Sequence, residues 1–248
     1  EKLNTFKLFG ISKALEEQRT QAQCNDADFE ERLGLLVDRE ITERENRRLT
    51  MRLRQARLSP QICLSDIDYR TTRGLDKSLM RSLSECQWIK DHVNILITGA
   101  TGVGKSFLAE ALAHQACLKG FRALKMRLPR LFEDLSVAKG DGRLNKLMNA
   151  IRRMDVLILD DYGLDVLSDQ ERKFFLEILE DRYEIHPTII TSQLPVKHWH
   201  ETIGNATLAD AILDRLVHNA YQLDLKGESM RKVRSKKNNS PAGKDDIK

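Results

Sequence analysis

Residues 99–106 read GATGVGKS, a complete G-x4-G-K-[ST] pattern. The apolar run NILIT at 94–98 precedes it, and helical spacing of apolar residues begins at Lys105. A glycine-rich turn between a strand and a helix lets several backbone N–H groups point into one concavity, with the positive end of the helix dipole behind them. The stretch therefore predicts a phosphate-binding loop, and the alternative is a chance glycine-rich turn.

We expect this loop to bind a nucleoside triphosphate, ATP, together with Mg²⁺. Lys105 would reach the β- and γ-phosphates as a mobile point charge, and Ser106 would offer its hydroxyl to Mg²⁺. The predicted nucleotide-binding residues are Gly99, Ala100, Thr101, Gly102, Val103, Gly104, Lys105, Ser106 and Phe107.

A second apolar run, VLIL at 156–159, ends in Asp160 and Asp161. Acids at the end of a parallel strand lie at the carboxyl edge of the sheet, the edge that also carries the phosphate loop. We expect Asp160 to hold Mg²⁺ through a water, so that Ser106 and Asp160 form the metal site. Asp161 would orient or deprotonate the attacking water. The alternative is that the two acids simply cap a strand.

Apolar runs alternate with helical patterns from residue 93 to residue 225. Strands are predicted at 94–98, 121–126, 155–159, 188–192 and 220–225. Helices are predicted at 105–119, 129–138, 143–153, 168–183 and 206–218. Strands that read as continuous apolar runs are typical of a parallel sheet covered by helices on both faces. The fold class is therefore α/β, with a five-stranded parallel sheet.

Three regions differ in composition. The composition and helical spacing of residues 1–60 predict a small all-helical N-terminal domain whose last helix spans about 37–57. Residues 61–234 predict the nucleotide-binding domain, which starts with a connector carrying one helix at about 75–89. The tail 235–248 is polar and without apolar periodicity, so we expect it to be disordered.

Composition excludes several classes of protein. With 248 residues and 41% hydrophobic residues, the chain can form a core, which excludes wholesale disorder. No apolar run approaches the roughly 20 residues of a membrane span, and no secretory leader is recognisable. Four cysteines without a CxxC pair argue against a zinc ribbon or disulfide scaffold. We therefore expect a cytoplasmic protein.

Basic residues are unevenly distributed although the formal net charge is only +4. Predicted DNA-binding residues on the last N-terminal helix are Arg44, Arg47, Arg48, Arg52 and Arg54. Two more, Lys139 and Arg143, flank a glycine-containing turn at 139–142. Such clusters suit phosphate backbones, and the 6% of aromatic residues offers few stacking platforms for a single strand, so duplex DNA is favoured. The alternative is that these residues form solvated helix faces or a solvent-exposed turn.

Weaker candidates for site residues lie at the end of the fourth predicted strand and beyond it. The polar residues 191–193 would reach between the γ-phosphate and Asp161, although an ordinary strand-to-loop turn would look the same. Arg215 could pair with a neighbour on its own surface or reach the nucleotide of the next subunit, and Arg231 could fold back onto the γ-phosphate. Residues 198–200, HWH, lack further metal-ligating neighbours and are interpreted as a surface loop.

The order of these motifs resembles that of the AAA+ ATPases, specifically the DnaC/IstB branch. The motifs are the phosphate loop, the DD pair, TSQ at 191–193, LDRL at 213–216 and GESMR at 227–231. The resemblance covers about residues 61–234. The opening stretch, LNTFKLFGISKALEEQ from residue 3, is similar to the N-terminal domain of IstB-like transposition helpers.

The resemblance implies a role for each matching position. Gly99 to Ser106 corresponds to Walker A and Asp160 to the Walker B metal acid, whereas Asp161 stands where most of the superfamily has glutamate. Either Ser192 or Gln193 corresponds to sensor 1. Arg215 corresponds to the arginine finger acting in trans, and Arg231 to sensor 2.

The resemblance also implies partners. Family members form ATP-dependent spirals or rings on duplex DNA, remodel it, and recruit or stimulate a cognate transposase. This implies a DNA-binding ATPase of a bacterial insertion sequence, acting in DNA transposition at the nucleoid. The alternatives are a DnaC-like replicative helicase loader and a non-hydrolysing, ATP-switched scaffold.

Overall fold

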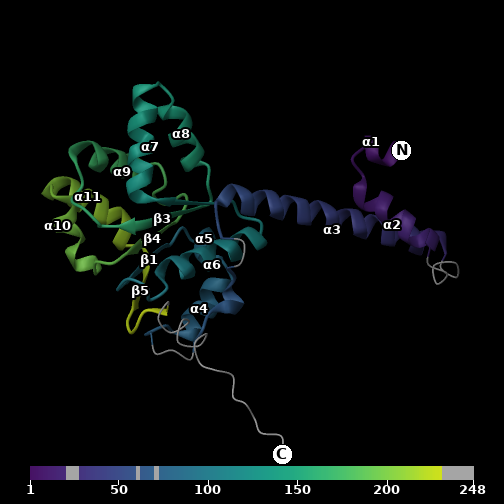
Figure 1. The fold of residues 1–248 in the computed structure, drawn as a ribbon, viewed down its shortest axis with the longest axis horizontal. Coiled ribbons are helices and arrows are strands. Elements are labelled where there is room, and N and C mark those ends of the chain that lie inside the picture. Colours follow the sequence, from purple (N-terminus) through teal and green to yellow (C-terminus); the bar gives the residue numbers. More distant parts are fainter. Residues whose placement is uncertain (21–27, 60–61, 70–72, 231–248) are drawn as a thin grey trace, which may run out of the picture. The chain divides into compact units, whose positions relative to one another are not determined.

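Five strands form one parallel sheet in the order β2-β3-β4-β1-β5 (Figure 1). The strands are β1 (Asn94–Gly99), β2 (Ala123–Arg127), β3 (Val156–Tyr162), β4 (Thr188–Ser192) and β5 (Ala220–Leu225). Every neighbouring pair is parallel, so the connections between successive strands are crossovers. The predicted five-stranded parallel sheet is thus confirmed. The computed structural model describes residues 1–20, 28–59, 62–69 and 73–230.

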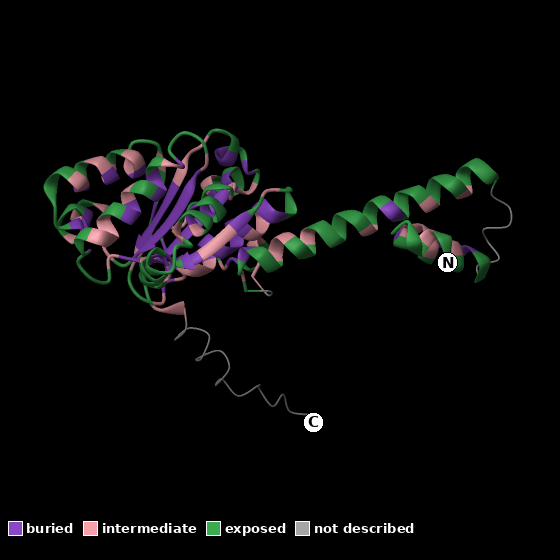
Figure 2. Ribbon diagram, turned by 90° about the horizontal axis from the view of Figure 1, so that it is seen from above, coloured by how far each residue is buried: buried purple, intermediate pink, exposed green. Residues whose placement is uncertain are grey.

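Helices cover both faces of the sheet. They are α4 (Lys77–Ser84), α5 (Gln87–Lys90), α6 (Lys105–Leu118), α7 (Leu128–Gly140), α8 (Leu144–Arg152), α9 (Asp169–Glu180), α10 (Trp199–Ile203) and α11 (Ala206–Val217), with 3-10 turns η2 (Leu64–Asp66) and η3 (Val196–His198). One face packs against α6, and the other shares a core with α7 to α11. All five residues of β4 are buried, as expected of a central strand in a sheet that is covered on both faces. Figure 2 shows that the strands of the sheet are largely buried, whereas much of the helix surface is exposed.

The connector before β1 differs from the prediction of one helix. It contains the two helices α4 and α5, separated at Cys86, where the backbone is left-handed with φ 60°. The break turns Trp88 into the core, where its indole N–H donates to the Leu83 carbonyl at 3.0 Å. Helical periodicity alone could not reveal this break, because both halves have the same apolar spacing.

Helix α9 ends at Glu180, earlier than predicted, and Arg182 follows it with only 2% of its surface exposed. Its guanidinium donates to the carbonyls of Ile151, Met154 and Pro187 at 3.0, 2.8 and 2.7 Å. Burial lowers the pKa of Arg182 to about 9. These bonds join the end of α8 to the segments that enter β3 and β4, so Arg182 fixes the amino edge of the sheet.

Trp199 corrects the interpretation of residues 198–200 as a surface loop. It opens α10 and is fully buried. Its ring centroid lies 4.5 Å from that of Tyr162, and its Nε1–H donates to the Leu194 carbonyl at 2.9 Å. Since Tyr162 directly follows the acid pair in β3, Trp199 supports the strand that carries those acids.

The chain divides into two compact units, Glu1–Arg54 and Gln55–Lys248. The first contains α1 (Lys2–Thr5), α2 (Phe9–Thr20) and most of α3 (Phe29–Ala56), which begins earlier than the predicted 37–57. The helical character of this region is therefore confirmed, while a domain boundary at residue 60 stays a prediction. None of the helices in the described residues combines the length and apolar character that a membrane span needs.

Glu40 of α3 holds the start of α2. Its side chain is almost fully buried, and Oε2 accepts from the backbone N–H groups of Gly10 and Ile11 at 2.6 and 3.2 Å. These donors belong to the unsatisfied N–H groups that open every helix. The hydrogen bond from Arg44, assisted by these N–H groups, holds the pKa of Glu40 below its ordinary 4.5.

We expect Gly10→Ala to destabilise the N-terminal unit by about 2 kcal/mol through overpacking. The added Cβ would lie 2.6 Å from Glu40 Cα and 2.7 Å from the Arg39 carbonyl oxygen. Gly34→Ala is the matched control, because a Cβ there meets nothing within 4 Å and should stabilise α3 by about 1 kcal/mol. Hydrogen exchange of residues 9–20 and of α3 measures both effects; equal protection in the two variants would contradict the contact.

Candidate nucleotide-binding site

The carboxyl ends of three adjacent strands carry the predicted site. In the order β3-β4-β1, residues that follow these ends meet at one edge of the sheet. The loop 99–106 follows β1, the acid pair lies at the end of β3, and residues 191–193 close β4. The topology therefore brings together three motifs that are far apart in the sequence.

Three glycines shape the loop. Gly99, Gly102 and Gly104 have φ values of 142°, 85° and 104°, a region that other residues rarely adopt. A Cβ at Gly99 would lie 2.3 Å from the Leu225 carbonyl oxygen, and one at Gly102 would lie 2.3 Å from Ser229 Oγ. A side chain at Gly99 would collide with β5 and one at Gly102 with Ser229, so the backbone path of the loop requires glycine at both positions.

Lys105 begins α6 and is 8% exposed. Its Nζ donates to the carbonyls of Gly99 and Ala100 at 2.7 and 2.9 Å. Burial lowers the pKa of Lys105, while the nearby charges of Asp161 and Asp160 act in the opposite direction. The ammonium group is therefore held on the loop, where phosphate oxygens could replace the carbonyls as acceptors.

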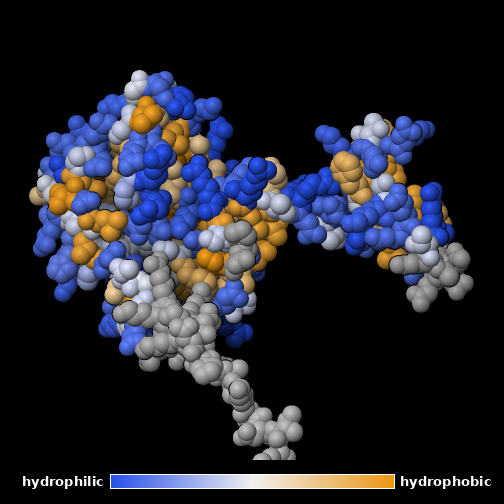
Figure 3. Space-filling model, viewed as in Figure 1, coloured by the Kyte–Doolittle hydropathy of each residue, from blue (hydrophilic) through white to orange (hydrophobic). Residues whose placement is uncertain are grey.

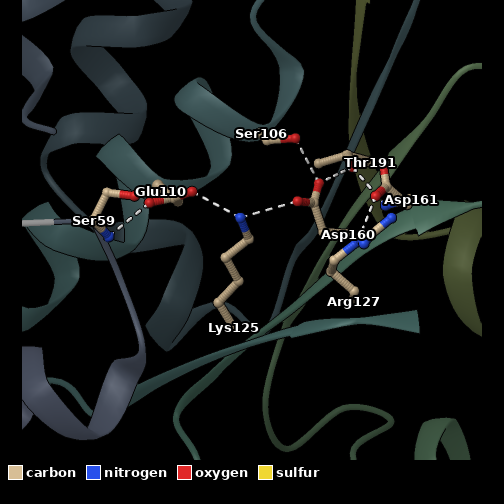
Figure 4. A network of polar contacts seen from close by, with 8 residues as sticks. All are labelled: Ser59, Ser106, Glu110, Lys125, Arg127, Asp160, Asp161 and Thr191. Carbon is tan, nitrogen blue, oxygen red and sulfur yellow. Dashed lines mark hydrogen bonds and ion pairs between the residues drawn. The ribbon is translucent and has the colours of Figure 1, made fainter. Parts of the chain in front are cut away.

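Asp160 is 4% exposed and uses both of its oxygens (Figure 4). Oδ1 accepts from Ser106 Oγ at 2.8 Å and from the Thr191 hydroxyl, and Oδ2 pairs with Lys125 Nζ at 3.0 Å. Burial raises the pKa of Asp160, but the hydrogen bonds from Thr191, Ser106 and Lys125 outweigh it, so the net shift is downward. The carboxylate is therefore ionised at neutral pH.

The oxygen atoms that could act as metal ligands suit Mg²⁺. Ser106 Oγ and Asp160 Oδ1 are hard oxygen donors that lie 2.8 Å apart beside the loop. Among the described residues, no group of three or more His, Cys, Asp or Glu is placed to hold a metal ion by itself. Mg²⁺ typically takes one or two protein oxygens and completes its shell with phosphates and waters. Ser106 and Asp160 would hold it there, and the ion would neutralise phosphate charge.

Asp161 adopts a left-handed conformation with φ 64° at a β-bulge. The pairing of β3 with β4 shifts register between Leu159 and Tyr162, and β3 continues beyond the predicted end at residue 159. The Asp161 N–H donates to Thr191 Oγ1 at 3.2 Å, and its carboxylate accepts from Arg127 Nε at 2.8 Å. The Asp161 carboxylate is thus engaged by Arg127, and its action on a water stays a prediction.

Residues 191–193 divide their contacts between the acids and the loop. The Ser192 hydroxyl is fully buried and donates to the Tyr162 carbonyl at 2.9 Å. Gln193 is exposed, and its Oε1 accepts from Thr101 Oγ1 of the loop at 2.7 Å. Of the two alternatives for sensor 1, Gln193 is the one that contacts the loop.

Sequence reasoning missed several polar residues around the site. Lys125 and Arg127 contact the acid pair, and Arg73 contacts the loop. Arg73 is 3% exposed, and its guanidinium donates to the carbonyls of Val103 and Asp68 at 3.2 and 2.7 Å. The one available signal was Lys125, a lysine between the apolar residues Leu124 and Met126 of β2.

Arg215 lies at the opposite edge of the sheet from the loop. Its carbonyl accepts from Nδ2 of Asn94, the first residue of β1, at 3.0 Å, whereas the loop follows the last residue of β1. A six-residue strand separates the two ends by roughly 17 Å at the usual rise per residue. The guanidinium pairs with Glu180 at 2.9 Å, so the structure does not bring Arg215 to the loop of its own chain.

The segment before Arg231 contacts the loop. The Met230 N–H donates to the Gly102 carbonyl at 2.9 Å, and Ser229 packs against the same glycine. Arg231 itself, like the predicted disordered tail 235–248, lies outside the described residues.

The predicted DNA-binding residues lie in both units. On α3, Arg44 pairs with Glu40 at 2.7 Å and the Arg47 guanidinium lies 4.7 Å from the centre of the Phe9 ring. The other three on this helix are Arg48, Arg52 and Arg54. In the second unit α7 continues to Gly140, so the predicted turn at 139–142 is shorter, and Arg143 pairs with Asp141.

The matching family model is that of IstB-like ATP-binding proteins, and it covers residues 1–238. An insertion-sequence ATP-binding protein of Sinorhizobium fredii (strain NBRC 101917 / NGR234) is 50% identical over 237 residues, 96% of this chain and 97% of the relative. The ATP-binding protein of insertion sequence IS21 from Pseudomonas aeruginosa is 34% identical over 92% of this chain and 86% of its own length.

Two solved structures are similar in fold. The structure of DnaI has a TM-score of 0.58 at 24% identity and covers 67% of this chain and 92% of its own. DnaA from Aquifex aeolicus with bound AMPPCP has a TM-score of 0.58 at 20% identity, with 76% of this chain and 59% of its own covered. Both have the AAA+ fold.

The free energy of unfolding that Asp160 contributes should decrease only at acid pH. Because its pKa in the folded state lies below the ordinary 3.8, its contribution is present above pH 3.8 and is lost as the pH falls further. We expect Asp160→Asn to cost about 2 kcal/mol of unfolding free energy at neutral pH, and the difference to shrink only in acid. Urea unfolding from pH 8 to pH 3 measures it; a difference that vanishes near pH 6 would contradict this account.

Proposed function

This chain belongs to the family of IstB-like ATP-binding proteins, and from that membership and the site geometry we propose that it is a DNA-dependent transposition ATPase. It would bind Mg²⁺-ATP, assemble on duplex DNA, remodel the DNA and recruit or stimulate a transposase. The 2.8 Å hydrogen bond between Ser106 and Asp160 carries the proposal. It joins a phosphate cradle to an ionised carboxylate at one edge of the sheet, which is what binding Mg²⁺ together with a triphosphate requires.

The residues of this edge would divide the work of hydrolysis. Lys105 would bind the β- and γ-phosphates, Gln193 would sense the γ-phosphate next to Thr101, and Asp161 would orient the attacking water. For this last role the ion pair between Asp161 and Arg127 must break. That ion pair is solvent-exposed, with 64% of the Arg127 side chain accessible, and such pairs contribute little stability.

Arg215 would complete the site of a neighbouring copy. It lies one strand length from its own loop, so it can meet a nucleotide only when a second subunit presents one. An arginine supplied in trans stabilises the charge that develops on the transferred phosphoryl group. Hydrolysis would therefore require assembly.

Exposed apolar side chains of the N-terminal unit support self-association (Figure 3). They are Phe6, Phe9, Phe29, Leu33, Leu35, Val37, Ile41 and Met51. Exposed apolar groups of this kind can be buried when copies of a chain associate. The arginines of the same unit would contact the DNA backbone without reading its sequence.

The relatives favour transposition over helicase loading. They are named as ATP-binding proteins of insertion sequences and match nearly the full chain, whereas the replication proteins share the fold alone. A second candidate is a non-hydrolysing, ATP-switched scaffold. The contact between Asp161 and Arg127 favours it, because a carboxylate held in an ion pair is not free to orient a water.

Mixing two inactive variants tests the shared site. We expect Arg215→Ala to bind ATP but to lose about a thousandfold in turnover, and Lys105→Ala to lose nucleotide binding. An equimolar mixture should regain part of the turnover, because Lys105→Ala subunits supply Arg215 to the intact loops of the other variant. Phosphate release with duplex DNA measures it.

Glu180→Gln is the matched control for Arg215. It weakens the 2.9 Å ion pair but keeps the guanidinium, so turnover should persist if Arg215 acts on a neighbour's nucleotide. Full activity of Arg215→Ala at dilute protein would exclude the shared site. Absence of turnover in the wild type, with or without DNA, would favour the scaffold.

Charge reversal tests the DNA surface of the second unit. We expect Lys139→Glu with Arg143→Glu to weaken duplex binding at least tenfold and to reduce its salt dependence, because phosphate contacts are lost. Lys90→Glu with Lys119→Glu changes the net charge equally at other exposed positions and should leave affinity unchanged. Fluorescence anisotropy at several salt concentrations measures both; equal loss in the two double variants would indicate a general charge effect.

A further inference from the structure

Lys125 is a half-buried cation of β2 that the proposed reaction does not use. Its Nζ lies 2.7 Å from Glu110 Oε1 and 3.0 Å from Asp160 Oδ2, and only 18% of its side chain is exposed (Figure 4). Glu110 and Asp160 are 5% and 4% exposed. One ammonium group is thus shared between two buried carboxylates, one of which is the predicted metal acid.

The two oxygens of Asp160 have different partners. Lys125 takes Oδ2, while Oδ1 faces Ser106 and the loop. A carboxylate held at one oxygen cannot rotate freely, so the other oxygen keeps its direction. Lys125 thereby orients the atom that would meet the metal, although it touches neither the metal nor the nucleotide.

Glu110 and Asp160 compete for the same Lys125 ammonium group. Glu110 projects from α6, where Oε1 binds Lys125 and Oε2 accepts from the Ser59 N–H at 2.8 Å. The cluster of Glu110, Lys125 and Asp160 carries a net charge of −1. Without Lys125 the charge would be −2, and with Glu110 made neutral it would be zero. Charges this close in a partly desolvated site change the binding of a divalent ion substantially.

We propose that Lys125 is a positioning residue that sets how strongly Mg²⁺ couples to nucleotide binding at Asp160, and that Glu110 tunes it. The inference rests on the proposed Mg²⁺-ATP site. It assigns a function to a lysine and a glutamate that would otherwise be a structural ion pair between β2 and α6.

The coupling can be measured without hydrolysis. The dissociation constant of a fluorescent ATP analogue is determined in EDTA and in excess Mg²⁺, and the ratio of the two constants is the Mg²⁺ enhancement. We expect Lys125→Met to raise this ratio about tenfold and Glu110→Gln to lower it about tenfold, because the two changes shift the cluster charge in opposite directions. The double variant restores the charge of −1, so its ratio should lie between those of the two single variants, and below the wild-type ratio because the lysine that orients Oδ1 is missing.

Opposite signs separate this role from a merely structural one. Loss of an ion pair that only supports the fold would weaken nucleotide binding in the same way in both single variants and in both buffers. Shifts in the same direction, or ratios that stay within twofold of the wild type, would overturn the proposal. Lys125→Arg keeps the charge and should keep the ratio near that of the wild type.

Two further comparisons keep the test decisive. Lys125→Met leaves Glu110 without its cation, and if this variant does not fold, the comparison of Glu110→Gln with the double variant still separates cluster charges of zero and −1. A wild type that binds no nucleotide, or binds it equally in EDTA and Mg²⁺, would refute the proposed function itself. A wild type with a clear Mg²⁺ enhancement and unmoved variants would refute only the role of Lys125.

Discussion

A nearly buried carboxylate needs hydrogen bonds on both oxygens, and Asp160 meets this need only because three other elements meet at the end of β3. Ser106 comes from α6, Thr191 from β4 and Lys125 from β2. The two strands lie on either side of β3, so the order of the sheet and the charge of Asp160 depend on each other. An unpaired carboxylate at this depth would cost several kcal/mol, so the sheet order also stabilises the charge that the proposed chemistry requires.

Much of this arrangement was predictable because it is local. Strand β1 and the first part of β3 are short apolar runs, and the phosphate loop is a contiguous motif whose glycines are needed for positive φ. Ser106 and Asp160 followed from their positions at the start of a helix and the end of a strand. Parallel strands then bring such ends to one edge, whatever the remaining sequence.

Other features could not be predicted because they depend on contacts between distant residues. The left-handed residue Cys86 divides a continuous helical pattern, and Trp199 is buried in a core that includes the distant residue Tyr162. The bulge at Asp161 depends on the register between β3 and β4. Glu110 and Lys125 lie on different elements, so only the packing of α6 on the sheet shows that they share one charge.

The separation of Arg215 from its own loop gives each subunit two unlike ends. If each arginine serves the next subunit along a row, the contacts run head to tail, and such contacts build rings when they close and open helical filaments when they do not. A row of copies that does not close on itself would then contain one fewer complete site than it has members. At one end of the row, the phosphate loop would have no arginine from a neighbour. At the other end, Arg215 would have no neighbouring nucleotide to contact, so the assembly would have a direction along the DNA.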